Sequence, residues 1–133
     1  MRSIFVPGKP FAKERPRLGG AGRVYTPGKT LSYEAKIGNL WSIKYQDLMV
    51  GHLELYLWCY FPVPEAASRI KKEQMLAGNI FPATSKDWDN ISKIVCDGLN
   101  LIAYHDDRQI AEAHVFKRYS ERPGLKVILE TIC

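Results

Sequence analysis

The sequence predicts a single small domain of the α/β or α+β class, with helices and a mixed β-sheet. Its 133 residues are a typical length for one domain, and a chain of this size buries roughly 68% of the surface that it exposes when unfolded. Segments with the period of two typical of strands alternate with segments of helical period. The resulting order, β-α-β-α-α-β-β, predicts one mixed sheet, and we expect residues 1–133 to form one domain without a linker or repeat.

The first half of the chain contains two predicted strands and one predicted helix. Residues 2–6 read as a short strand that a Pro-Gly pair ends. Apolar residues at helical spacing predict a helix from about residue 30 to 48. In residues 52–63 leucines alternate with polar side chains, as expected for a half-buried strand. We assign the aromatic-rich run at its centre, residues 58–61, to the core.

The second half contains two predicted helices and two predicted strands. Residues 65–78 indicate a short polar helix, and residues 88–100 a second helix with one aliphatic side. Strands are expected at about 109–119 and 125–132, joined as a hairpin through the short connection between them.

Composition excludes several classes of protein. A hydrophobic content of 46% and a charged content of 25% are those of a globular chain and argue against disorder. No apolar run approaches the roughly 20 residues that span a bilayer, and the first residues lack the apolar core of a signal peptide, so we expect a cytoplasmic protein without a membrane partner. The three cysteines are far apart and odd in number, which argues against both a disulfide framework and a zinc site and favours reduced thiols.

Positive charge gathers in the first 30 residues. The chain has a formal net charge of +5, yet this segment holds seven lysines and arginines against the single acidic residue Glu14. The cations alternate with Pro, Gly and two aromatic residues, so we expect a contact loop. Such a loop suits a polyphosphate backbone, because each neutralised phosphate releases condensed counterions. A solvated basic surface without a partner also fits the charge alone.

Negative charge gathers in residues 86–110, which contain five aspartates. At about 100° per residue, Asp89, Lys93 and Asp97 share one side of the predicted helix, opposite its aliphatic side. Asp87 lies at the helix start, and Asp106 and Asp107 lie at the entry to the next strand. A helix start and a strand start can converge, which would bring these carboxylates together.

Each aspartate also has a structural explanation. Asp87 could cap the helix, the pairs four residues apart could stabilise a solvated helix, and Asp106-Asp107 could be a turn. One compact acidic site on a basic protein nevertheless has the electrostatics of a metal-dependent phosphodiesterase. Magnesium prefers oxygen ligands from one or two carboxylates and polarises a phosphoryl oxygen.

The acidic window also carries a family resemblance. KDWDNISKIVCDGL followed by LIAYHDDRQI resembles the D-x-D-N-x-x-K-x-x-x-D-x-L…D-D-x-Q core of the RusA-like Holliday junction resolvases. The opening PGKPFAKERPR…GRVYTP is similar to the amino-terminal pattern of that family, so the resemblance covers nearly the whole chain in order. Three departures are Trp88 inside D-x-D, Leu101, which stands where many members have Gly, and the loop spacing to Asp106, which varies in the family and bears on the choice between Asp106 and Asp107.

The resemblance implies a set of functional residues. It assigns catalytic roles to Asp87, Asp89, Asp107 and Lys93, with Asp106 as a supporting metal ligand beside the three aspartates. The cofactor implied is Mg²⁺, with Mn²⁺ as a substitute. Expected contacts to DNA are the cations of the amino-terminal segment: Lys9, Lys13, Arg15, Arg17, Arg23 and Lys29.

The resemblance further implies a RusA-like mixed fold, a symmetric homodimer, and paired nicks that resolve a four-way DNA junction in recombination and repair. A twofold protein suits a twofold junction. Two alternatives stay open at this point: a broader nuclease that cuts flaps or forks, and a DNA-binding module without catalysis.

Overall fold

A four-stranded mixed sheet forms the centre of the protein. The computed structural model describes residues 1–14, 17–25, 27–83 and 86–133. Strand β4 (Leu53–Phe61) pairs in parallel with β5 (Ile110–Tyr119) and antiparallel with β6 (Gly124–Thr131), while β1 (Arg2–Pro7) pairs antiparallel with β6. The order across the sheet is β1-β6-β4-β5. The predicted mixed sheet with helices, an α+β fold, is therefore confirmed.

The predicted hairpin of the last two strands is wrong. Both strands exist close to the predicted bounds, but β4 lies between them and pairs with each. The short connection crosses the end of β4, where the backbone N–H of Ser120 donates to the carbonyl of Phe61 at 2.9 Å. Nine residues of β4 alternate between buried and half-buried positions, which suits the centre of a sheet better than its edge.

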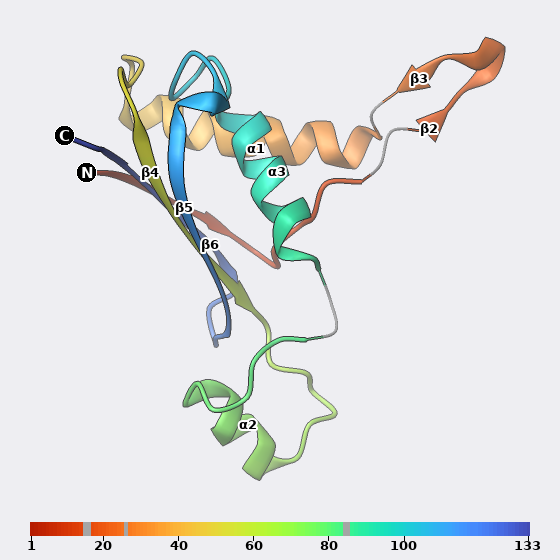
Figure 1. Ribbon diagram of the computed structural model, residues 1–133. Coiled ribbons are helices and arrows are strands. Elements are labelled where there is room, and N and C mark those ends of the chain that lie inside the picture. The colour runs from red at the N-terminus through yellow and green to blue at the C-terminus, as the bar shows by residue number, and fades with distance from the viewer. Residues whose placement is uncertain (15–16, 26, 84–85) are drawn as a thin grey trace.

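Helices cover one face of this sheet (Figure 1). Helix α1 (Gly28–Lys44) and helix α3 (Trp88–Leu99) pack on that face, and the short helix α2 (Arg69–Leu76) lies beyond the end of β4. The inward side chains of β4 are almost completely buried, and burying one leucine fully contributes about 1.5–3 kcal/mol. These inward side chains are Leu53, Leu55, Leu57, Cys59 and Phe61.

Two glycines let α1 and α3 approach closely. A Cβ added at Gly98 would lie 2.9 Å from the carbonyl oxygen of Glu34, and one added at Gly38 would lie 3.0 Å from the carbonyl oxygen of Gly98. Because no side chain separates the helices there, the polar residues that border this contact are held close together.

The basic segment forms a small ribbon. Strands β2 (Arg17–Leu18) and β3 (Val24–Tyr25) pair antiparallel around the 3-10 turn η1 (Gly20–Gly22), and the ribbon extends away from the sheet and helices (Figure 1). The expected loop is thus partly strand. In the described part of the chain, none of the helices combines the length and the apolar character that crossing a bilayer requires.

The other face of the sheet carries no helix of the described residues (Figure 1). The assignment of the aromatic run in β4 to the core is therefore only half right. Cys59 and Phe61 are buried, whereas Trp58 and Tyr60 point to this second face and are half-buried. The three cysteines are free: Cys59 is buried, Cys96 is half-buried and Cys133 is exposed.

Candidate active site

Helix α3 turns an aliphatic side to the sheet and an acidic side to solvent. Asp89 and Lys93 are exposed on the side away from the core, as the helical spacing predicts. The opposite side chains are at most 1% exposed: Ile91, Ile94, Val95 and Leu99.

The first turn of α3 holds two carboxylates with few partners. Asp87 occupies the N-cap position, but its side chain makes no capping hydrogen bond. One of its oxygens accepts from the side-chain amide of Asn90 at 3.5 Å, and Asp89 accepts from the backbone N–H of Asn90 at 3.0 Å. Capping by its side chain does not account for Asp87, so both carboxylates have oxygens available for a ligand.

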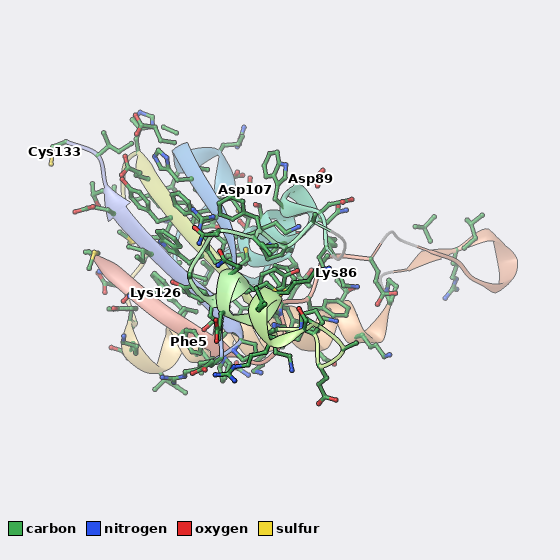
Figure 2. All side chains as sticks on the ribbon, turned by 90° about the horizontal axis from the view of Figure 1, so that it is seen from below. Phe5, Lys86, Asp89, Asp107, Lys126 and Cys133 are labelled. Carbon is green, nitrogen blue, oxygen red and sulfur yellow. The ribbon has the colours of Figure 1, made fainter. Side chains whose placement is uncertain are left out.

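Lys93 connects the helix with the entry to β5. Its ammonium lies 3.4 Å from an oxygen of Asp97 and 3.9 Å from an oxygen of Asp107. The Lys93 side chain is still 56% exposed, so it can reach a phosphate in solvent. Figure 2 labels Asp89 and Asp107 around this end of the molecule.

Asp97 also binds a cation from the amino-terminal segment. The ammonium of Lys13 donates to the Asp97 carboxylate and lies 3.6 Å from Glu34 on α1. The hydrogen bond with Asp97 raises the pKa of Lys13 above its ordinary value. The backbone N–H of Lys13 donates to the carbonyl of Asn90 at 3.0 Å, so this segment is fixed along α3.

The adjacent Asp106 and Asp107 have different surroundings. Asp106 caps the 3-10 turn η2 (Asp107–Gln109): its side chain accepts from the backbone N–H of Arg108, and the side chain of Gln109 accepts from the backbone of Asp106. Hydrogen bonding from Arg108 holds the pKa of Asp106 below its usual range. Asp107, in contrast, has Lys93 as its ion-pair partner.

The sequence interpretation missed Lys117, which lies near the site. The ammonium of Lys117, on the core side of β5, donates at 2.8 Å to the carbonyl of Lys86, directly before Asp87. It also lies 5.4 Å from the ring centroid of Phe61. A charged residue at an inward position of a strand between Val115 and Tyr119 is the signal that could have revealed it.

Comparison with known proteins identifies the family. Residues 7–130 match the family described as Endodeoxyribonuclease RusA, which includes the acidic helix, η2 and the basic ribbon. The chain belongs to the RusA endodeoxyribonuclease family. It is also 31% identical over 133 residues to the uncharacterized protein YqaN of Bacillus subtilis (strain 168), which covers 96% of this chain and 94% of YqaN.

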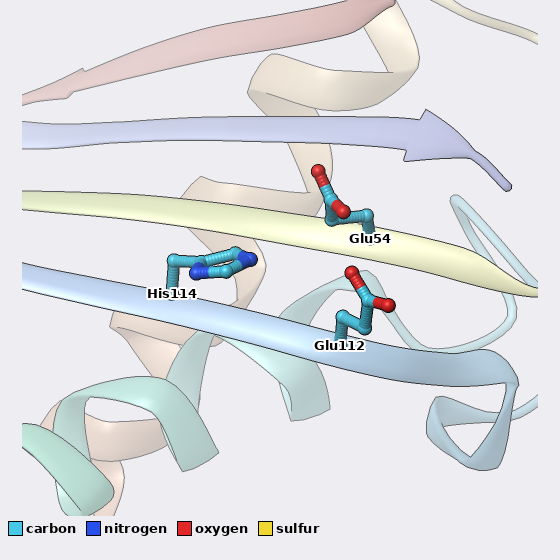
Figure 3. A group of neighbouring side chains, drawn as sticks. All are labelled: Glu54, Glu112 and His114. Atoms are coloured by element: carbon cyan, nitrogen blue, oxygen red, sulfur yellow. The ribbon is translucent and has the colours of Figure 1, made fainter.

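The carboxylates of this RusA chain fit a hard divalent cation by chemistry. Aspartate oxygens are ligands that Mg²⁺ accepts, with water completing its octahedron. Within the described ranges, however, three potential ligand atoms lie within 4.8 Å of one another only at Glu54, Glu112 and His114 (Figure 3), on the helix-free face of the sheet. Asp87, Asp89 and Asp107 do not form such a set in the described part of the chain.

The cations expected to contact DNA in RusA proteins are spread along the amino-terminal segment. Lys9, Arg23 and Lys29 are exposed. Lys13 is half-buried between two carboxylates, and Arg17 lies in β2. Arg15 lies outside the described residues.

Proposed function

We propose that this RusA-family endodeoxyribonuclease is a Mg²⁺-dependent enzyme that resolves four-way DNA junctions by paired symmetric nicks. It would act as a homodimer in recombination and repair. Family membership supports the nuclease chemistry. The main support for the proposed active site is the position of Lys93. Its ammonium lies between Asp97 and Asp107, on the same side of α3 as Asp89.

Asp87, Asp89 and Asp107 are the proposed ligands of Mg²⁺. Mn²⁺, which accepts the same oxygen ligands, would substitute for it. When bound, the cation polarises the scissile phosphate and lowers the pKa of the attacking water. Asp106 has a supporting role, because one of its oxygens already accepts from the backbone N–H of Arg108 and pairs with the Arg108 guanidinium.

Lys93 is the proposed contact for the scissile phosphate. Its charge is partly balanced by Asp97 and Asp107, and its exposure leaves room for a DNA strand. A cation placed where negative charge develops lowers the barrier by electrostatic stabilisation, which is worth roughly 10²–10³ in rate for one such group. Lys93→Met should lose this factor while junction binding persists.

The basic ribbon and the residues around it are the proposed DNA-binding surface. Lys9, Arg23 and Lys29 are exposed and make no ion pair among the described residues. We include Arg15 and Arg17 on charge alone. Lys13 adds positive charge beside α3, but Asp97 and Glu34 already hold its ammonium, so its replacement should affect DNA affinity less.

The test is cleavage of a synthetic four-way junction, with linear duplex, flap and fork DNA as controls, in Mg²⁺, in Mn²⁺ and in EDTA. The variants are Asp89→Asn, Asp107→Asn and, as a matched control, Glu65→Gln, an exposed carboxylate ahead of α2. Paired symmetric nicks by wild type and Glu65→Gln, absent in EDTA and from both Asn variants although they bind, are the expected result.

Other outcomes point to the alternatives. Equal cutting of flaps and forks would keep the chemistry but make the chain a general branched-DNA nuclease. Tight junction binding without cleavage in either metal would contradict the enzyme and favour a DNA-binding module. A further variant, Asp106→Asn, tests the assignment within the pair: undiminished cleavage by Asp107→Asn, together with lost cleavage by Asp106→Asn, would exchange the proposed roles of these two residues.

A further inference from the structure

The helix-free side of the sheet, here called the open face, presents four rows of side chains across its strands. Strand register places Glu54 between Glu112 and Glu130 in the first row, and Tyr56 between His114 and Ile128 in the second. The third row runs from Phe116 through Trp58 and Lys126 to Phe5 on β1, and the fourth holds Arg118 and Tyr60.

Aromatic rings fill the middle of the open face. The rings of Trp58 and Phe116 stack at 4.0 Å between centroids with 16° between their planes. Tyr56 and His114 stack at 4.7 Å, and Trp58 lies 6.3 Å from Tyr60. None of these rings is buried: Tyr56, Trp58 and Tyr60 on the central strand β4 are half-buried, and on the edge strand β5 Phe116 is half-buried and His114 is exposed. A contiguous patch of this kind, rimmed by charges, is typical of an interaction surface.

Charge on the open face changes sign along the strands. The first row consists of three carboxylates, those of Glu54, Glu112 and Glu130 (Figure 3 shows two of them). The opposite end carries Lys126, which is exposed, and Arg118, whose guanidinium lies 5.8 Å from the Trp58 centroid. The third row lies four residues from the acidic row, so the two ends are about 13 Å apart.

We propose that the open face is the interface with a second copy of this chain, packed about a twofold axis that runs across the strands. The homodimer itself is part of the proposed function. The present proposal adds which surface forms the interface and in which direction the twofold axis runs. An axis across the strands reverses the partner's sheet, so the carboxylates of each copy meet the cations of the other. An axis along the strands would set carboxylates against carboxylates.

The same axis keeps both active sites accessible. A rotation about it leaves each strand opposite the same strand of the partner, so both β5 edges lie on one side of the dimer. Asp107 lies in η2, directly before β5, and α3 packs on the helix-covered face of the sheet. The two sites therefore border the same side of the assembly without being buried by it, as a twofold DNA junction requires.

A nucleic acid strand fits the open face less well. Aromatic rings do stack on bases, but the three carboxylates of the first row would repel a phosphate backbone that crosses the sheet. The basic ribbon, which suits phosphate, lies on the other side of the molecule (Figure 1).

The test is the dimer dissociation constant of the full chain, measured by sedimentation equilibrium, for wild type, Lys126→Glu, Glu130→Lys and the double variant. Each single reversal should weaken the dimer at least about tenfold. The double variant should recover most of the loss, because the twofold axis pairs opposite ends of β6. Lys71→Glu, exposed on α2, changes the net charge by the same amount as Lys126→Glu and should leave the dimer unchanged. Circular dichroism and thermal unfolding verify that every variant folds.

Three results would overturn the proposal. A wild type that stays monomeric at high concentration, or single reversals that leave dissociation unchanged, would remove the interface from the open face. A double variant as weak as the singles would contradict the direction of the axis. Wild-type monomers that bind single-stranded oligonucleotide and lose it on Phe116→Ala would make the face a nucleic-acid surface.

Failure of the interface is distinguishable from failure of the proposed function. If the chain cleaves junctions in a metal-dependent manner but the charge reversals leave the dimer dissociation constant unchanged, the nuclease function stands and the interface is rejected. Rescue of the dimer by the double variant, in a chain that cleaves no DNA, would do the reverse.

Discussion

Replacing Gly98 by Ala tests whether the close approach of α1 and α3 holds the acidic site together. The added Cβ would lie 2.9 Å from the carbonyl oxygen of Glu34, 3.2 Å from the Cβ of Ile37 and 3.3 Å from the Cα of Glu34. Two of these atoms are backbone, so relief requires α1 to shift. The shift would move Glu34, which contacts Lys13, away from Asp97 on α3.

Two opposing terms set the magnitude. Alanine is favoured over glycine inside a helix by about 1 kcal/mol, whereas overpacking a tight contact costs about 1–3 kcal/mol. We therefore expect Gly98→Ala to reduce the free energy of unfolding by about 1 kcal/mol. For a chain of this length, that lowers Tm by roughly 3–5 °C.

Urea and thermal unfolding measure the effect, and the same substitution elsewhere provides controls. A Cβ at Gly28, the first residue of α1, meets no atom within 4 Å, so Gly28→Ala should be neutral or stabilising. At Gly38 the nearest atom, 2.6 Å away, is the flexible end of Ile102, so Gly38→Ala should fall between the two. Stabilisation by Gly98→Ala equal to that of Gly28→Ala would refute the argument from close packing.

Three further predictions concern backbone strain, pH and DNA affinity. Leu101 has a φ of 63°, which costs a non-glycine residue roughly 1–2 kcal/mol; Leu101→Gly should raise Tm and Leu101→Val should lower it in thermal unfolding, and the opposite order would contradict the strain. Hydrogen bonding and charge from Glu54 raise the pKa of Glu112. The raised pKa contributes stability that is present below the ordinary value and lost as pH rises through the folded value. The free energy of unfolding of Glu112→Gln, relative to that of wild type, should therefore rise between pH 4 and pH 7 in urea unfolding of dilute protein. A difference that stays constant over this range would contradict the raised pKa of Glu112. Arg23→Gln and Lys29→Gln should each reduce the slope of log affinity against log salt by roughly 1 in fluorescence-anisotropy titrations of a junction, and unchanged slopes would exclude contact with phosphate.

The element pattern was readable because it is local. Leucines at alternate positions of β4 and aliphatic residues at helical spacing on α3 each identify an element and its buried side from a short window of sequence. The separation of Asp89, Lys93 and Asp97 from the core followed from helical geometry alone. The D-x-D…D-D motif added the family because its fixed spacings are specific.

The pairing of strands was not readable, because it depends on residues far apart in the chain. A short connection between two strands favours a hairpin in isolation, yet β4 inserts between β5 and β6 and satisfies hydrogen bonds on both sides. The exposed aromatic side of β4 has the same cause. The alternation of β4 places Trp58 and Tyr60 on the side opposite the buried leucines, but only the packing of the helices shows that this second side has no helix over it.

The arrangement of the site was likewise decided by tertiary structure. The sequence by itself determined which residue types are available: carboxylates at Asp87, Asp89, Asp106 and Asp107, and a lysine one turn into α3. Only the fold made Asp106 the cap of η2 and Asp107 the partner of Lys93, because packing of α3 against the sheet sets where its side chains meet the entry to β5. Spacing along a chain specifies chemistry, whereas the distance between two charges depends on how separate elements pack.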